Sequence, residues 1–365
     1  MKIVILMSAL TMGGAERVAI SLANYLSEKE EIYLISFDNQ EPSYALNKKV
    51  HLFLNKEKIV NNRLKGFQQR LKFVKKTLKE IHPDVIFTMF YQTAAFALYY
   101  KYFSNNKKVV VISSERCNPL SADRGNFSKF LNEKISKHCD GFIFQTERVK
   151  KLYHPSIQKK SIVIHNPISN PLLKEISKDK VRTEKTITSM GRLTEQKAQD
   201  VMIRAFSKIA SDFKDYKLVI YGEGELRPYL ENLIKELNLN NQVLLPGASS
   251  SALIDVSKSQ VFLLTSRFEG MPNALMEAMA VGIPSISTDC NFGPAELIEN
   301  EKNGFLVKVD DEEEIASKLR LLLENEELRN QISLESKKII ETHSIPYIFD
   351  EYFSYFQTVA KKAKK

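Results

Sequence analysis

The segment VFLLTSRFEGMPNALMEAMAVGIPSIST, residues 261–288, decides the fold, because it contains a strand, a turn, a helix and a second strand in one run. VFLLTSRF (261–268) has the apolar character of a buried strand, Gly270-Met271-Pro272 forms the turn, and ALMEAMAV (274–281) starts a helix. IPSISTD (283–289) is the next strand. Apolar strands joined by helices are typical of parallel sheets that are covered on both faces. This segment therefore predicts an α/β fold.

The same alternation runs through the whole chain. The other runs that we interpret as strands are KIVILM (2–7), EIYLISF (31–37), PDVIFTMF (83–90), VVVISSE (109–115), GFIFQT (141–146), SIVIHNP (161–167), KTITSMGR (185–192), KLVIYGEGE (217–225), QVLLPG (242–247) and GFLVKV (304–309). A chain of 365 residues favours two domains. We expect each to be a doubly wound parallel sheet, with the boundary in the Asn-Pro-bearing stretch 165–180 and a ligand site in a central cleft.

The first apolar run allows a second interpretation, because Lys2 followed by IVIL could mimic a signal peptide. IVIL is rich in strand-forming residues and no small-residue cleavage site follows it, so we interpret it as the first buried strand. Three cysteines without paired spacing, Cys117, Cys139 and Cys290, indicate a reducing compartment and argue against disulfides and structural zinc. Of these, Cys117 beside Arg116 could be a nucleophile, but no base is assigned to it and a structural role is favoured.

Charge is divided unevenly between the two halves. Residues 1–180 contain 30 Lys and Arg against 16 Asp and Glu, whereas residues 181–365 contain 23 against 28. A basic half suits nucleic acid, an anionic membrane surface or an acidic small ligand. We exclude nucleic acid as a partner, because the sequence has no helix-turn-helix, zinc-finger, RNP or Arg-rich pattern.

One basic helix stands out in the first half, at 63–81. Its apolar stripe is Leu64, Phe67, Leu71, Val74, Leu78 and Ile81, and its cations are Arg63, Lys65, Arg70, Lys72, Lys75, Lys76 and Lys79. The stripe could face the sheet with solvated lysines around it. Alternatively, the helix meets anionic lipid head groups or a diphosphate lipid.

Three glycine-bearing or cationic loops follow predicted strands. Gly13 and Gly14 precede a helix, whose first amides favour an anion, although the GxGxxG spacing of dinucleotide sites is absent. Arg192 and Lys197 lie five residues apart in a strand-to-helix turn, where they could converge on a diphosphate or be ordinary surface cations. The third loop carries Gly222 and Gly224.

The fourth loop lies within the opening segment. Glu269 follows the predicted strand, and we expect it at the mouth of the cleft, with the amides of Met271, Asn273 and Ala274 directed towards a ligand. Glu277 lies about one turn inside the predicted helix, in which each residue advances ~1.5 Å along the helix axis. A glutamate among alanines and methionines needs a hydrogen-bonding partner, because an unpaired buried carboxylate is costly. We expect Glu277 to accept hydrogen bonds from ligand hydroxyls.

These loops occur in a characteristic order. GGAER (13–17), GRLTEQK (191–197), GEGELR (222–227), FEGMPNALMEAMAVGIP (268–284), with its two glutamates eight residues apart, and GPAELIENEKNGFLV (293–307) closely resemble the retaining glycosyltransferases of family 4, which have the GT-B fold. The resemblance extends over nearly the whole chain and is most specific at 262–309. It implies an acceptor-binding Rossmann-like domain at 1–168, a nucleotide-sugar-binding Rossmann-like domain at 169–345, and a terminal helix at 346–365 that crosses back to the first domain.

The resemblance also implies roles for individual residues. Matching positions assign Glu277 to the ribose hydroxyls of the donor, Glu269 to the donor sugar, and Arg192 and Lys197 to the diphosphate. The remaining matches are Gly13 and Gly14 beneath the donor and acceptor, Gly270, Met271, Pro272, Asn273 and Ala274 in the diphosphate loop, Gly222 and Gly224 in a second glycine turn, and Pro246 and Gly247 at the base. Relatives often have histidine at the position of Arg116, so a guanidinium replaces an imidazole near the sugar.

The expected reaction needs no metal or other cofactor. The sequence has no DxD motif, and the run DDEEE (310–314) is the kind that begins a helix, where acidic residues favour the dipole. We predict transfer of a hexose or N-acetylhexosamine from a UDP-sugar to a polyprenyl-diphosphate-linked glycan in surface polysaccharide assembly. We expect a cytoplasmic protein that can also bind the inner face of the cell membrane as a peripheral protein. The alternatives are a GDP-mannose donor, a non-catalytic nucleotide-sugar binder, and an NAD-dependent oxidoreductase or epimerase, which the missing fingerprint disfavours.

Overall fold

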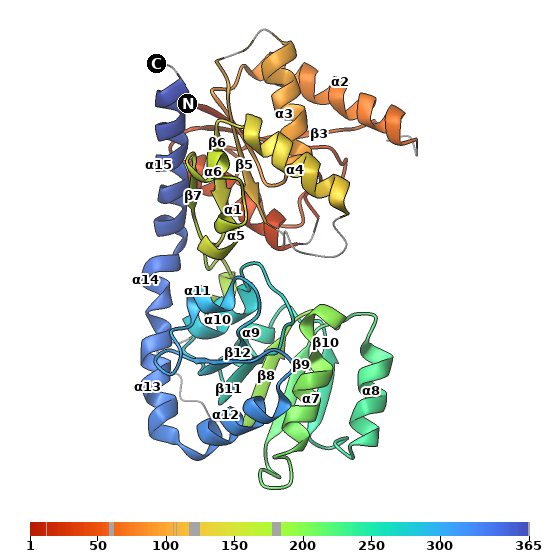
Figure 1. Ribbon diagram of the computed structural model, residues 1–365, viewed down its shortest axis with the longest axis vertical. Helices are drawn as coiled ribbons and strands as arrows, with labels where there is room; N and C mark the ends of the chain where they lie inside the picture. The colour runs from red at the N-terminus through yellow and green to blue at the C-terminus, as the bar shows by residue number, and fades with distance from the viewer. Residues whose placement is uncertain are drawn as a thin grey trace. The chain divides into compact units, whose positions relative to one another are not determined.

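The computed structural model describes residues 1–11, 13–57, 62–104, 106, 108–116, 125–176 and 184–363. The chain forms two compact units, one made of Met1–Ser169 with Ile345–Lys365 and the other of Asn170–Ser344. Each unit contains its own parallel sheet with helices on both faces (Figure 1). The predicted α/β architecture of two Rossmann-like sheets is confirmed.

The first unit has a seven-stranded sheet in the order β3-β2-β1-β4-β5-β6-β7. All neighbouring strands pair in parallel. Its strands are β1 (Lys2–Met7), β2 (Glu31–Ser36), β3 (His51–Leu54), β4 (Val85–Thr88), β5 (Val110–Glu115), β6 (Gly141–Phe144) and β7 (Ser161–Val163). Its helices are α1 (Gly14–Leu26), α2 (Arg63–Ile81), α3 (Tyr91–Phe103), α4 (Asn126–His138), α5 (Glu147–Lys151), α6 (Pro155–Gln158) and α15 (Ile345–Ala363).

The second unit has a six-stranded sheet in the order β10-β9-β8-β11-β12-β13, also parallel throughout. Its strands are β8 (Thr186–Met190), β9 (Lys217–Tyr221), β10 (Val243–Gly247), β11 (Val261–Leu264), β12 (Ser285–Thr288) and β13 (Phe305–Val307). Its helices are η1 (Pro171–Lys174), η2 (Glu195–Lys197), α7 (Gln199–Ser207), α8 (Arg227–Glu236), α9 (Ala252–Val256), α10 (Asn273–Ala280), α11 (Pro294–Leu297), α12 (Glu312–Glu324), α13 (Glu326–Lys337) and α14 (Ile339–His343).

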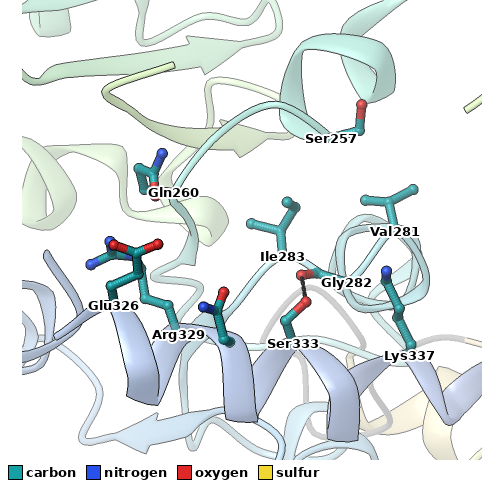
Figure 2. Close-up of a pocket in the computed structure, with 10 residues that line it drawn as sticks. Ser257, Gln260, Val281, Gly282, Ile283, Glu326, Arg329, Ser333 and Lys337 are labelled. Carbon is teal, nitrogen blue, oxygen red and sulfur yellow. Dashed lines mark hydrogen bonds between the residues drawn. The ribbon is translucent and has the colours of Figure 1, made fainter. Parts of the chain in front are cut away.

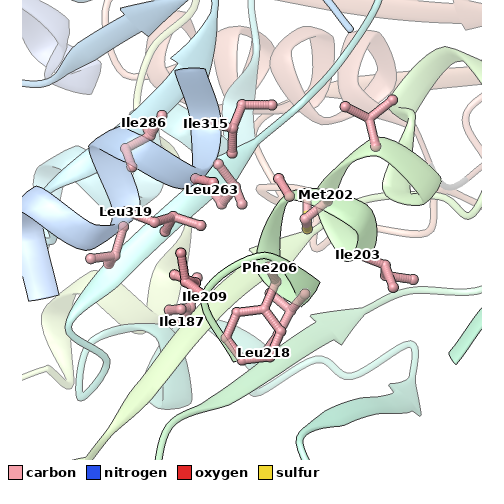
Figure 3. Packing of buried hydrophobic residues seen from close by; sticks show 14 of the residues in the cluster. Ile187, Met202, Ile203, Phe206, Ile209, Leu218, Leu263, Ile286, Ile315 and Leu319 are labelled. Carbon is pink, nitrogen blue, oxygen red and sulfur yellow. The ribbon is translucent and has the colours of Figure 1, made fainter. Parts of the chain in front are cut away.

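The sheets are the centres of the hydrophobic cores. In the second unit, Leu218 and Leu263 from the strands pack with Phe206 of α7 and Leu319 of α12, all fully or almost fully buried (Figure 3). In the first unit, α2, α3 and α4 lie together on one side of the sheet (Figure 1), whereas α1 and α15 supply the core of the other face. Because both faces of each sheet are buried, the central strands appear as continuous apolar runs in the sequence.

Two details differ from the sequence prediction. The edge strand β3 was not predicted, because its four residues are only partly buried or exposed and lie between polar segments. The predicted strand 261–268 was too long, since β11 ends at Leu264 and Phe268 makes only an isolated bridge with Asn291. Beyond Leu264 the Thr265 hydroxyl donates to the carbonyl of Ala198, at 2.9 Å, so the chain turns towards the loop after β8.

The basic helix predicted at 63–81 is α2, and its stripe divides into two parts. Val74, Leu78 and Ile81 are buried in the core, whereas Leu64 and Phe67 are 68% and 45% exposed. The described helices include none that is both long and apolar enough to cross a bilayer. Cys139 and Cys290 are buried free thiols, and the prediction for Cys117 lies outside the described residues.

Candidate active site

The second unit brings five loops together at the carboxyl edge of its sheet. The loop after β8 bonds to the loop after β9 through Leu193 N–H and the Glu223 carbonyl, at 2.9 Å. It also bonds to the loop after β11 through Gln196 Nε2 and the Phe268 carbonyl, at 2.9 Å. The end of β10 and the loop after β12 join the same group, through a backbone bond between Gly222 and Gly247 and one between Gly293 and Gly270. Strand order reverses between β8 and β11, which is where doubly wound sheets bind their ligands.

Lys197 and Glu269 meet at this reversal point. Lys197 Nζ lies 2.6 Å from Glu269 Oε1, which also accepts a hydrogen bond from Ser266 Oγ at 2.6 Å. The side chains are 17% and 7% exposed, so solvent screens the pair only weakly. The loops after β8 and β11 are therefore joined by an ion pair at the edge where a ligand is expected.

The backbone fixes the position of Lys197. Ala198 has a left-handed conformation (φ 48°), which is unfavourable for a residue with a Cβ atom. The Thr265 hydroxyl donates to the carbonyls of Lys197 and Ala198, at 3.1 and 2.9 Å. Because hydrogen bonds from the loop after β11 hold this turn of the loop after β8, the ammonium of Lys197 is preorganised.

Helix α10 follows the turn after β11. It begins at Asn273 with Pro272 as its N-cap residue, and the Met276 N–H donates to the Pro272 carbonyl at 3.1 Å. The first amides of a helix, here including that of Ala274, have no partner within the helix and favour an anion. Met271 is buried, so the turn itself is well packed.

Glu277 is buried within α10, with 7% of its surface exposed. Asn170 Nδ2 donates to Glu277 Oε2 at 3.0 Å, and the Asn170 side-chain oxygen accepts from the Leu172 N–H. The side-chain amide of Asn170, the first residue of the second unit, therefore orients a candidate ribose-binding carboxylate.

The other predicted glycines allow close backbone approach. A Cβ atom at Gly222 would overlap the Gly191 carbonyl oxygen, and one at Gly224 would overlap that of Leu193. Gly222 N–H donates to the Gly247 carbonyl at 2.9 Å, and Gly247 has φ 97° at the end of β10, after Pro246. These glycines let three loops pack against one another without side chains between them.

The loop after β11 is similarly close to its neighbour. A Cβ atom at Gly293 would overlap the Gly270 carbonyl, which accepts a hydrogen bond from the Gly293 N–H at 2.8 Å. Arg192 is the second residue of the loop after β8, and its side chain is exposed. Lys197 thus contacts Glu269, whereas no contact joins Arg192 to either side chain within the residues described.

In the first unit, Gly13, Gly14 and Arg116 also follow strands. Gly13 is the N-cap residue of α1, and the Glu16 carboxylate folds over its Cα. Arg116 comes directly after β5. Its Nη1 donates to Asn166 Oδ1 at 2.6 Å, its Nη2 to the Tyr352 hydroxyl of α15, and its Nε to Ser114 Oγ at 3.4 Å.

Sequence reasoning missed the residues that support this site. Ser266, Asn170 and Gln196 hold Glu269, Glu277 and the loop after β11, respectively. Ser266 and Gln196 each lie three or fewer residues from a predicted site residue, which was the available signal. Asn170 lies in the Asn-Pro-rich stretch that was interpreted only as a boundary.

A buried thiol lies near the ion pair. Burial raises the pKa of Cys290 to about 12, and the negative charge of Glu269 contributes in the same direction. The thiol is therefore neutral at physiological pH. In the described parts of the chain, no group of three His, Cys, Asp or Glu side chains is arranged to hold a metal ion.

Two parallel Rossmann-like sheets, with a cation and a carboxylate paired at the reversal point of the second, are the arrangement of a glycosyltransferase of the GT-B class. The family model described as "Glycosyltransferase Family 4" matches residues 12–170, and the model "Glycosyl transferases group 1" matches residues 174–339. The chain belongs to glycosyltransferase family 4 and is a glycosyltransferase.

Named relatives agree with this assignment. The chain is 31% identical over 350 residues to the N-acetylgalactosamine-N,N'-diacetylbacillosaminyl-diphospho-undecaprenol 4-alpha-N-acetylgalactosaminyltransferase of Campylobacter jejuni, covering 92% of this chain and 94% of the relative. It is 28% identical to the GalNAc-alpha-(1->4)-GalNAc-alpha-(1->3)-diNAcBac-PP-undecaprenol alpha-1,4-N-acetyl-D-galactosaminyltransferase of the same organism, covering 96% and 97%. Among solved structures, Anabaena HepE in complex with UDP has a TM-score of 0.79 at 17% identity, covering 98% of this chain and all of that one.

Proposed function

We propose that the protein is a retaining, metal-independent glycosyltransferase that transfers a hexose or N-acetylhexosamine from a UDP-sugar to a polyprenyl-diphosphate-linked glycan in surface polysaccharide biosynthesis. The observation that carries the proposal is the buried pair of Lys197 and Glu269 at the reversal point of the second sheet. It places a fixed cation next to the carboxylate that matches the family's sugar-binding glutamate. A site that releases a diphosphate beside a sugar needs a cation to stabilise the diphosphate and a carboxylate to position the sugar.

The donor is assigned to the loops of the second unit. Glu277, oriented by Asn170, accepts hydrogen bonds from the ribose hydroxyls. The turn of Pro246 and Gly247 seats the base. Arg192, Lys197 and the first amides of α10, with the turn 270–274, bind the diphosphate, because a helix N-terminus and fixed cations favour phosphate.

The reaction exchanges one bond at the anomeric carbon for another. The bond from this carbon to the β-phosphate oxygen breaks, and its electron pair stays with the departing diphosphate. The acceptor hydroxyl oxygen forms the new glycosidic bond on the same face, and its proton passes to the departing phosphate oxygen. Lys197 and Arg192 stabilise the charge that develops on that phosphate, and Glu269 positions the sugar.

The acceptor is assigned to the first unit and to a membrane surface. Two relatives that match almost the whole chain are named for acceptors carried on undecaprenyl diphosphate. Helix α2 presents exposed Leu64 and Phe67 together with exposed lysines such as Lys65 and Lys72. Exposed apolar residues among cations suit an anionic bilayer, where we place the protein as a peripheral enzyme of the cytoplasmic face.

The test is a panel of UDP- and GDP-sugars with a lipid-linked acceptor extract, scored for sugar incorporation with and without EDTA. We expect incorporation from a UDP-hexose or UDP-N-acetylhexosamine that EDTA does not reduce, and an α-linked product from an α-linked donor. Incorporation only from GDP-mannose would replace the donor assignment. Nucleotide binding without turnover across the panel would make the chain a non-catalytic homologue.

A further inference from the structure

A pocket lies in the same unit as the proposed donor loops but at the opposite edge of its sheet. Its volume is about 310 Å³, near the lower limit of ~300 Å³ for typical small-molecule sites. It lies where β11 and β12 begin, between the turn that follows α10 and the length of α13 (Figure 2). The lining residues used below are Ser257, Gln260, Gly282, Arg329, Asn330 and Lys337. The pocket is separate from the loops that follow the strands.

The main feature of the pocket is a buried guanidinium. Arg329 is 8% exposed, and its Nη1 donates to the carbonyls of Leu322 and Leu323, the latter at 2.9 Å. These bonds cap the end of α12, which is the structural role of the side chain. They leave Nε buried without a hydrogen-bond partner, and within the described residues no carboxylate forms an ion pair with this guanidinium. Because a buried charge without a counter-ion is costly, the site favours an anion.

A second cation lines the same space. Lys337 follows Arg329 two turns later on α13, and its stem lies against Gly282, where a Cβ atom would overlap its Cε. Among the lining residues that the structure describes, Glu326 is the only carboxylate, and it lies at the exposed start of α13. Two cations against one exposed carboxylate leave the described lining with a net positive charge.

The rest of the lining indicates which kind of anion fits. Gln260 is a neutral polar residue whose amide nitrogen donates to the Glu184 carbonyl, at 3.1 Å. Ser257 and Asn330 add further polar groups, and the described lining has no aromatic ring on which a base could stack. We propose that this pocket binds a small phosphorylated polyol of the size of a sugar phosphate, with the phosphate at Arg329 and Lys337 and the hydroxyls at the neutral polar groups.

The pocket contacts the far end of the donor helix. Ser333 Oγ donates to the Gly282 carbonyl at 2.6 Å, and Gly282 follows α10, whose eight residues span about 12 Å. A ligand at the turn 281–283 therefore touches the same helix whose first turn faces the donor. Any coupling between the two sites must act in both directions, since linkage is reciprocal.

The test is isothermal titration calorimetry of the full chain with glucose 1-phosphate, and with glucose and inorganic phosphate as the two parts of that probe. We expect glucose 1-phosphate to bind at least about tenfold more tightly than either part. Asn330→Asp, which adds a negative charge at the pocket, should weaken binding by about tenfold or more. Its matched control is Gln331→Glu, which adds the same charge one residue further along α13, and it should change the affinity by less than about twofold.

A second variant pair tests the phosphate end. Lys337→Gln should weaken binding by about tenfold, whereas Lys338→Gln, at an exposed position paired with Glu335, should not. No binding by the wild type, equal binding of inorganic phosphate alone, or equal losses in pocket and control variants would each overturn the proposal. The readout is direct binding and needs no sugar transfer. A failure of the pocket proposal can therefore be distinguished from a failure of the proposed glycosyltransferase activity.

Discussion

Lys197 and Glu269 form an ion pair of 2.6 Å between loops that are 72 residues apart in the chain. The pair joins the two strands between which the sheet order reverses. Its burial means that neither charge can be lost without exposing the other to an apolar environment. The same contact is therefore important for the stability of the second unit and for the proposed chemistry, and the two contributions can be separated by experiment.

For catalysis, we expect Lys197→Met to lower kcat by about 10²–10³, the usual effect of removing one preorganised group that stabilises developing charge. Glu269→Gln should retain nucleotide binding and lose turnover. Steady-state kinetics with the donor found in the panel provide the measurement. Lys185→Met, at an exposed pair with Asp215, is the control and should leave kcat unchanged. Normal turnover by Glu269→Gln would refute its placement at the sugar.

For stability, each single variant should lower the free energy of unfolding by about 3–5 kcal/mol, because it leaves a buried charge unpaired. Replacing both residues, Lys197→Met with Glu269→Gln, should cost less than the sum of the two single changes. Urea unfolding measures all three. The equivalent cycle at Lys185 and Asp215 should give a much weaker coupling, because solvent screens this exposed pair. Equal coupling in both cycles would show that burial does not strengthen the pair.

Glu277 tests the assignment of the ribose. Hydrogen bonds to a charged group are worth about 1.5–3 kcal/mol, so Glu277→Gln should weaken UDP binding by about tenfold or more. Asn170→Ala should weaken it less, since Asn170 only orients the carboxylate. Calorimetric titration with UDP is the measurement, and Glu299→Gln, at an exposed pair with Lys302, is the control. An unchanged affinity in Glu277→Gln would place the nucleotide elsewhere.

Arg116 connects the end of β5 to α15. The Tyr352 hydroxyl that accepts its Nη2 belongs to a fully buried side chain, whose ring lies 5.7 Å from that of Phe87. Tyr352→Phe preserves the ring and removes the acceptor, so we expect it to lower the free energy of unfolding by about 1–3 kcal/mol. Tyr347→Phe, at a half-exposed position of the same helix, is the control for urea unfolding. If Arg116 also contacts the donor, Arg116→Ala will lower kcat beyond the effect of Tyr352→Phe.

The sequence predicts the parts of this molecule that depend on local patterns. The central strands were predictable because burial on both faces makes them continuous apolar runs, and Glu269 and Glu277 were prominent because carboxylates are unusual beside such runs. The fold class and the family follow from these features. Edge strand β3 is too short and too exposed to have the same signature.

The supporting contacts depend on tertiary structure instead. Asn170 meets Glu277 across 107 residues of chain, and Tyr352 meets Arg116 across 236. Neither spacing leaves a periodic trace in the sequence. The left-handed Ala198 could not be predicted either, because the bonds from Thr265 that hold its backbone come from a residue 67 positions away. What surrounds the site was therefore less predictable than the site itself.

Helix α2 offers a test of membrane contact. Leu64→Glu with Phe67→Glu should reduce binding to vesicles containing phosphatidylglycerol by about tenfold or more, since burying one such side chain is worth about 1.5–3 kcal/mol. Leu334→Glu, which replaces an equally exposed leucine of the second unit, should have no effect. Co-sedimentation at low salt is the measurement. Failure of the wild type to sediment would refute a membrane role for α2.

The buried thiols predict a loss of stability at alkaline pH. Burial raises the pKa of Cys139 from 9.0 to about 12, and that of Cys290 to about 12 as well. The neutral thiols thus favour the folded state, a contribution fully present below about pH 9 and lost as pH rises towards 12. Between pH 9 and 10 each thiol should lower the free energy of unfolding, with a slope approaching about 1.4 kcal/mol per pH unit.

Urea unfolding at intervals from pH 8 to 10 measures this dependence. Tyrosines such as Tyr33 and Tyr355, whose pKa values burial raises from 10.0 to about 12, contribute mainly at higher pH, so the thiols dominate this interval. Cys139→Ala lowers stability at every pH by removing buried atoms, but it should also flatten the slope. Cys139→Ala with Cys290→Ala should flatten it further. A slope that neither change reduces would mean that another group, and not the buried thiols, limits alkaline stability.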